Sequence, residues 1–68
     1  MPTGYIVRVL RDRGFGFIKP DVTGSDIFFH SDEVTGDVFN DLNAGDRVSY
    51  DFDKDRRGRT LARNVKPL

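Results

Sequence analysis

Apolar and polar side chains alternate in short runs along this chain, and this period of two restricts the fold more than any other feature of the sequence. The runs are YIVRVL, FGFI, DIFFH, RVSYDFD and TLARNV, and turn-forming Gly, Pro, Asp and Asn residues separate them. No window of about ten residues has the spacing of an amphipathic helix. Only HSDEV predicts a short helical turn, with Ser31 or Asp32 as its cap. The sequence therefore predicts an all-β protein of five short strands.

A chain of 68 residues predicts a single domain, spanning residues 1–68. A flat sheet of five strands would expose its edges and lack a second layer, whereas a small closed or nearly closed barrel avoids both problems. Every second side chain of each strand then points into the barrel. The expected core consists of Ile6, Ile18, Ile27, Phe29, Val34, Val48, Tyr50, Phe52 and Val65.

The formal net charge is zero, but the charges are unevenly placed along the chain. Residues 1–20 carry four basic side chains and one acidic one, and residues 47–68 carry seven basic and three acidic ones. Residues 21–46 carry seven acidic side chains and no Lys or Arg. If the two basic ends meet in space, one face of a neutral molecule is positive. The plainer interpretation is that both signs are scattered over a soluble surface.

Cysteine is absent, which excludes disulfides and thiolate metal sites. No segment approaches the length of a membrane-spanning helix, and the N-terminus lacks the pattern of a signal peptide. We therefore expect a cytoplasmic protein with no membrane partner. We also expect a monomer that carries no cofactor and no metal.

Alternation along the second and third runs places four rings on the outside of neighbouring strands. When Ile18 and Ile27 point inward, the residues next to them in the strand point outward. Rings on a sheet surface stack on unpaired nucleobases, and nearby basic side chains meet the phosphates. The rings are Phe15, Phe17, Phe28 and His30, framed by Arg8, Arg11, Arg13 and Lys19. The pattern predicts binding of single-stranded nucleic acid.

Other interpretations of the same residues remain open. The faces could be reversed, with the phenylalanines in the core, or the exposed rings could bind a protein, which makes a protein-interaction module the main alternative function. An enzyme is disfavoured, because His30 is the only histidine and there is no serine motif and no cysteine. RGFGFI also fits the RNA recognition motif, but that fold needs two helices and places its motifs in the opposite order.

RGFGFI followed by DIFFH resembles the paired ribonucleoprotein motifs of the cold-shock domain family, and the resemblance extends from TGYIV through LNAGDRVSY to ARNV. It implies a five-stranded antiparallel Greek-key barrel of the oligonucleotide-binding class. It also implies binding of single-stranded RNA and DNA with little sequence specificity. The function implied is that of an RNA chaperone or a regulator of transcription or translation.

The resemblance assigns roles to individual positions. Arg8 occupies the position of a tryptophan in the family, and Ser31 the position of a frequent phenylalanine, so we expect weaker binding than in a typical member. An outward Arg8 requires a bulge or bend in the first strand, because simple alternation places it on the inner face with Ile6. The implied nucleic-acid-binding residues are Phe15, Phe17, Phe28 and His30 for stacking, Arg8, Arg13, Lys19 and Arg57 as basic contacts, Phe39 for a further base, and Asp26 for a base edge.

Overall fold

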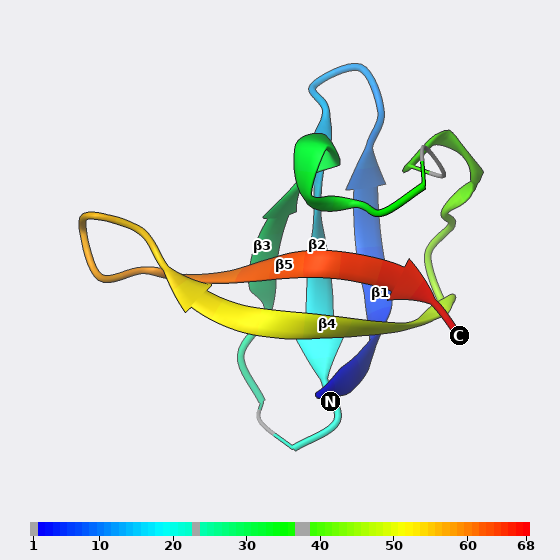
Figure 1. The fold of residues 1–68 in the computed structure, drawn as a ribbon. Helices are drawn as coiled ribbons and strands as arrows, with labels where there is room; N and C mark the ends of the chain where they lie inside the picture. Colours follow the sequence, from blue (N-terminus) through cyan, green and yellow to red (C-terminus); the bar gives the residue numbers. More distant parts are fainter. Residues whose placement is uncertain (1, 23, 37–38) are drawn as a thin grey trace.

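The structure is a computed structural model that describes residues 2–22, 24–36 and 39–68. Within these residues it contains five β-strands and two 3-10 helices of one turn each (Figure 1). The strands are β1 (Thr3–Leu10), β2 (Phe15–Pro20), β3 (Ile27–His30), β4 (Arg47–Lys54) and β5 (Thr60–Pro67), and the helices are η1 (Ser31–Glu33) and η2 (Phe39–Asp41). Each of the five alternating runs forms a strand, as predicted.

The strands close into a barrel in the order β1-β2-β3-β5-β4, and β4 pairs back onto β1. The pairs are antiparallel except β3 with β5, which run parallel and are joined at Phe28 and Leu61. β4 and β5 form a hairpin that crosses the other strands and projects beyond them at its turn (Figure 1). The predicted five-stranded Greek-key barrel of the oligonucleotide-binding class is confirmed, apart from this one parallel pair.

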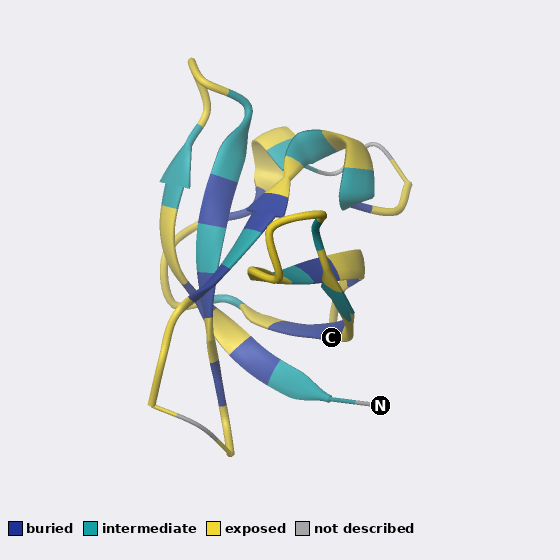
Figure 2. Cartoon of the chain, turned by 90° about the vertical axis from the view of Figure 1, so that its left-hand side faces the viewer, coloured by how far each residue is buried: buried dark blue, intermediate teal, exposed yellow. Residues whose placement is uncertain are grey.

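The barrel interior confirms eight of the nine predicted core residues. Buried and less buried residues alternate along the strands, as the bands of colour in Figure 2 show. Leu42 and Ala62 also belong to the core, although neither was predicted. Leu42 lies outside the strands, where alternation gives no signal. The buried apolar side chains of the described residues are Ile6, Ile18, Ile27, Phe29, Val34, Leu42, Val48, Tyr50, Ala62 and Val65.

The prediction that Phe52 lies in the core is wrong, because this residue is 50% exposed. Phe52 lies on the same side of β4 as Tyr50, and the two rings meet edge to face with their centroids 5.3 Å apart. β4 pairs with β1 only from Arg47 to Ser49, and Ser49 lies opposite Thr3 at the start of β1. β4 has therefore passed the N-terminal end of β1 before it reaches Phe52. The alternation of β4 continues beyond the point where the barrel can cover it.

A bulge in β1 decides where Arg8 points. Ile6 pairs with Ile18, but Arg8 pairs with Phe17, so Val7 is an extra residue in this strand. The extra residue reverses the alternation, and Val9 instead of Arg8 packs against the core. The irregularity that an outward Arg8 requires is therefore present.

The helical turn expected in HSDEV forms as η1, but its cap is neither Ser31 nor Asp32. His30 is the N-cap, with extended backbone angles, and its Nδ1 accepts a hydrogen bond from the backbone N–H of Asp32 at 3.1 Å. Ser31 is already the first residue of the helix, so the side chain before it, that of His30, is the one that accepts the free N–H of Asp32. The last strand residue of β3 thus also starts the helix.

Candidate nucleic-acid interface

Four side chains on the outer face of β2 and β3 form what we call the aromatic strip: Phe15, Phe17, Phe28 and His30. β2 and β3 pair so that Phe15 lies opposite His30 and Phe17 opposite Phe28. The Phe15 and Phe28 ring centroids are 5.3 Å apart with an interplanar angle of 35°, and Phe17 meets both rings at steep angles. The phenylalanines are half-buried against one another, and His30 is exposed. The predicted faces are confirmed, which excludes the reversed arrangement.

Gly16 explains why the rings of β2 alternate with bare backbone. A Cβ atom at this position would lie 2.7 Å from the carbonyl oxygen of Arg8 and 2.7 Å from Cζ of Phe29. Phe29 is fully buried, so its ring fills the space that any larger residue would need. Core packing beneath Gly16 therefore holds β2 close to its neighbours, with Phe15 and Phe17 on the opposite face.

The η1 cap orients His30 at the end of the aromatic strip. Its Nδ1 accepts the Asp32 N–H, so in the neutral ring the proton resides on Nε2. Asp32 Oδ2 lies 3.6 Å from Nδ1, and the His30 side chain remains 50% exposed. The imidazole thus offers a flat face and one N–H donor to a ligand.

Three basic side chains border the aromatic strip: Arg8, Arg13 and Lys19. Arg8 pairs with Phe17 across β1 and β2, and Lys19 lies two residues after Phe17 on the same face. Arg13 is exposed in the turn between these strands. In the part of the chain that the structure describes, no ion pair or side-chain hydrogen bond involves the charged groups of these three residues. These three side chains therefore have no acidic partner within the described part of the fold.

Arg11 binds the protein's own backbone, although the sequence analysis places it with the cations around the rings. Its guanidinium donates hydrogen bonds to the carbonyl oxygens of Asn40 and Leu42, at 3.2 and 2.5 Å, and to Oδ1 of Asn43 at 2.9 Å. These bonds join the β1–β2 turn to the long segment between β3 and β4. Arg11 therefore positions a loop.

The other predicted residues lie at different distances from the aromatic strip. Asp26 is exposed just before β3 and borders the same groove as Phe28. Arg57 is exposed at the β4–β5 turn. Phe39 is half-buried in η2 and packs against the core ring Phe29, with centroids 6.2 Å apart. Asp37 and Val38, which precede it, lie outside the described residues. The structure brings Asp26 to the strip and leaves Phe39 beside the core.

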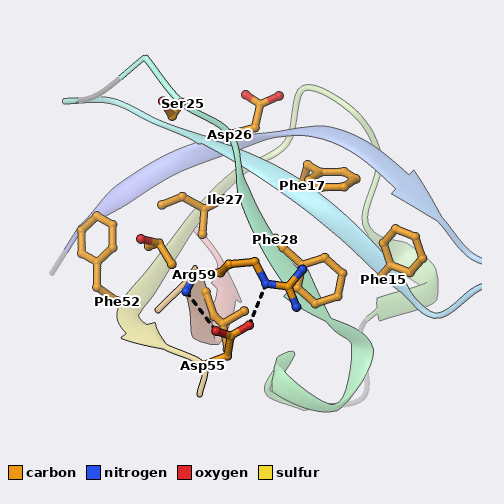
Figure 3. A pocket seen from close by; sticks show the side chains of 11 residues that line it. Phe15, Phe17, Ser25, Asp26, Ile27, Phe28, Phe52, Asp55 and Arg59 are labelled. Atoms are coloured by element: carbon orange, nitrogen blue, oxygen red, sulfur yellow. Dashed lines mark hydrogen bonds and ion pairs between the residues drawn. The ribbon is translucent and has the colours of Figure 1, made fainter. Parts of the chain in front are cut away.

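A groove of about 1080 Å³ extends from the aromatic strip to the β4–β5 hairpin, and we call it the seam groove because it follows the junction of β3 with β5. Phe17 and Phe28 lie at one side of it (Figure 3). Phe52, Leu61 and Arg59 come from the hairpin. β3 and β5 are joined by a single paired position, which leaves this junction open beyond Phe28.

Sequence reasoning also missed Tyr5 and Leu10, which lie across from strip residues or their strand neighbours on β2. Tyr5 is 37% exposed and pairs with Lys19, and half-buried Leu10 pairs with Phe15. Alternation from the buried Ile6 already directs Tyr5 outward, so the signal for Tyr5 was present. Leu10 could be found only with knowledge of the β1 bulge.

Neither a cluster of metal ligands nor a membrane-spanning helix is found among the described residues. Nowhere in residues 2–22, 24–36 and 39–68 do three or more His, Asp or Glu side chains gather closely enough to hold a metal ion. No helix in these segments is long and apolar enough to cross a membrane.

Comparison with known proteins gives this surface its context. The sequence pattern of the family described as the 'Cold-shock' DNA-binding domain matches residues 2–68. The chain is 38% identical over 66 residues to the cold shock-like protein CspE of Bacillus anthracis, covering 97% of this chain and 96% of the relative. It is 35% identical over 63 residues to the cold shock-like protein CspG of Shewanella violacea, covering 93% and 90%. The chain belongs to the cold-shock domain family, as the paired motifs predicted.

Family membership also decides between classes of function. Cold-shock domain proteins bind nucleic acids and are not enzymes. The prediction that this chain is not an enzyme is confirmed on that ground.

Proposed function

We propose that this chain binds single-stranded RNA or DNA with little sequence specificity, by stacking bases on the aromatic strip. One observation carries the proposal: three phenylalanine rings contact one another on the outside of β2 and β3, while the core is filled by other residues. Such a surface costs free energy in water unless a ligand covers it, and base stacking on aromatic rings contributes about 1–3 kcal/mol per base.

The surrounding residues then take complementary roles. Arg8, Arg13 and Lys19 bind phosphates beside the rings, and Arg57 does so at the hairpin. Asp26 accepts a hydrogen bond from a base edge, and His30 stacks and donates from Nε2. Phe39 caps a further base at the long loop. Few of these contacts read base identity, so the protein acts as an RNA chaperone or as a regulator of transcription or translation in the cytoplasm.

Truncation of the rings tests the proposal. Phe17→Ala and Phe28→Ala should each weaken binding to fluorescent oligo-dT and oligo-U by about 1–3 kcal/mol. Neither ring fills the core, so thermal melting should change little. Leu68→Ala is the matched control, because Leu68 is also an exposed apolar residue but follows the C-terminal end of β5.

Two outcomes would contradict the proposal. Unchanged binding in both alanine variants means that the rings do not stack on bases. Loss of folding means that the rings support the core after all. Phe17→Leu then distinguishes a role in folding from a role in stacking, because it keeps apolar volume without a flat face.

A further inference from the structure

We infer that the seam groove binds one additional nucleobase of the same strand, stacked on Phe52, beyond the bases on the aromatic strip. This inference rests on the proposed function. It assigns a binding role to a hairpin ring that lies outside the paired motifs.

Phe52 is the first reason. It is a large apolar side chain that is half exposed, although its strand neighbour Tyr50 is fully buried. The edge-to-face contact with Tyr50 fixes the place of the ring at the mouth of the groove. A ring that is already ordered loses little conformational freedom when a base covers it.

Continuity with the aromatic strip is the second reason. Phe17 and Phe28 belong both to the strip and to the seam groove, so a strand that stacks on them arrives at the groove directly. Figure 3 shows Phe52 on the opposite side of the groove from Phe15 and Phe17. A volume of about 1080 Å³ lies at the upper end of the range for ligand pockets, about 300–1,000 Å³, and it includes the space over Phe17 and Phe28. The groove is therefore large enough for a nucleobase at its hairpin side.

The groove also offers partners for the polar edge of a base. Ser25 and Asp26 contribute from the segment before β3, and Thr60 contributes from the start of β5. Hydroxyl groups donate or accept hydrogen bonds, and a carboxylate accepts from the amino or imino N–H of a base. Apolar faces with polar edges between them match the shape of a nucleobase better than that of an aliphatic side chain.

Arg59 brings positioned N–H donors to the groove, as part of an ion pair with Asp55. Its Nε bonds to Asp55 Oδ2 at 2.9 Å, and Asp55 Oδ1 accepts the backbone N–H groups of Arg57 and Arg59. The bond from the Arg59 backbone N–H is the main reason that the pKa of Asp55 lies below its usual range, so this anchor stays charged. The arrangement leaves the two Nη groups of Arg59 without a partner among the described residues, and Arg59 lines the groove together with Phe28. A phosphate beside the groove therefore meets N–H donors of Arg59 that Asp55 holds in place.

A site-specific fluorescent reporter tests the inference, because the chain contains no tryptophan. Phe52→Trp provides a single indole at the groove, and Leu68→Trp provides a matched one after the C-terminal end of β5. Each is titrated with oligothymidylates of about four and about eight nucleotides. Emission of the Phe52→Trp protein should be quenched by the longer strand and not by the shorter one, while the Leu68→Trp protein should respond to neither.

Affinity measurements with the native ring removed complete the test. Phe52→Ala should weaken binding of the longer strand at least about fivefold and leave the shorter strand unchanged. Phe52→Leu should behave in the same way, and it preserves apolar contact with Tyr50 if the alanine variant melts early. Phe17→Ala, which removes a ring of the aromatic strip, should weaken both strands.

The outcomes separate this inference from the proposed function. If Phe17→Ala weakens binding while the Phe52 variants match the parent at both lengths, the strip binds bases and the seam groove does not. Equal quenching by the shorter strand would also overturn the inference, because Phe52 would then serve the same bases as the strip. If Phe17→Ala has no effect either, both the inference and the proposed function are wrong.

Discussion

The two sides of the barrel use their arginines differently. On the β4–β5 side, Arg47 binds Asp21 at 2.8 Å, and Arg63 binds both Glu33 at 3.2 Å and Asp53 at 2.6 Å. On the outer face of β1 and β2, Arg8 and Arg13 have no such partner within the described residues, and neither has Lys19. Arg47 and Arg63 therefore join segments of the fold, whereas Arg8, Arg13 and Lys19 are cations that our proposal assigns to phosphates.

This difference shows how charge is distributed over a chain whose formal net charge is zero. The acidic segment of residues 21–46 folds so that Asp21 and Glu33 neutralise arginines of the C-terminal segment. Arg8, Arg13 and Lys19 border the aromatic strip and have no acidic partner among the described residues. The distribution of charge in space, rather than its sum, is what a phosphate backbone meets.

The largest expected effect comes from moving the aromatic face itself. Gly16→Ala places a methyl group 2.7 Å from both the Arg8 carbonyl oxygen and the Phe29 ring, and overpacking of this kind costs about 1–3 kcal/mol. Both the melting temperature and oligo-dT affinity should fall, because β2 shifts away from its neighbours. Thermal melting and fluorescence titration measure the two effects.

Gly24→Ala is the control for this substitution. An added Cβ atom at Gly24 meets nothing within 4 Å, so neither stability nor binding should change. If Gly16→Ala proves as harmless as Gly24→Ala, the packing beneath the aromatic strip is looser than the barrel implies.

A smaller effect should follow from exchanging the unpaired cation Arg8. Arg8 pairs with Phe17, so its guanidinium can lie on a base and also meet a phosphate. Arg8→Trp should tighten binding to pyrimidine oligonucleotides at high salt, because apolar contact does not depend on salt. Arg8→Ala should weaken binding mainly at low salt, where the lost charge counts most.

Affinity for one oligonucleotide across a salt series measures both Arg8 variants, with melting curves as the folding control. Arg63→Ala serves as the comparison from the side of the ion-paired arginines and should leave binding unchanged. If all proteins stay folded and neither Arg8 variant differs from the parent at any salt concentration, this cation does not reach the ligand.

Alternation in the sequence was sufficient to place the strands, most of the core and the rings of the aromatic strip. Alternation predicts these positions correctly because each of these residues lies in a part of its strand that is paired with neighbouring strands, so one of its faces is covered by the barrel. It failed at Phe52, because nothing in a local pattern tells where the neighbouring strand ends. The sequence required a bulge for an outward Arg8, and the structure located it at Val7.

The ion pairs could not be predicted in the same way. Arg47 and Asp21 are 26 residues apart, and Arg63 and Glu33 are 30 apart, so each pair depends on how the barrel closes. Arg11 is an example. The sequence predicts it among the cations around the rings, but in the closed barrel it donates to loop carbonyl groups 29 and 31 residues away.

The smallest expected effect concerns the side of the barrel where Arg47 and Arg63 form ion pairs, which we call the paired side. This effect depends on pH. Hydrogen bonds from Arg63 hold the pKa of Asp53 below its ordinary value, and a bond from Thr3 does the same for Asp21. A carboxyl group whose pKa is lower in the folded state stabilises the protein above its unfolded pKa of about 3.9. That contribution is lost as the pH falls through the folded value. Stability should therefore be level near neutrality and decline below about pH 4.

Arg63→Gln identifies the share of this decline that the paired side contributes. The variant should be slightly less stable than the parent at neutral pH, and the difference should shrink at acid pH, where Asp53 is protonated in both proteins. The pKa of Asp53, followed by NMR titration, should rise toward its ordinary value. Arg13→Gln is the matched control, since it removes a cation that has no partner among the described residues, and it should leave urea unfolding unchanged at both pH values. Equal stability of the two variants at neutral pH would mean that the paired arginines contribute no more to folding than the unpaired ones, and the distinction between the two sides would then lie in ligand binding alone.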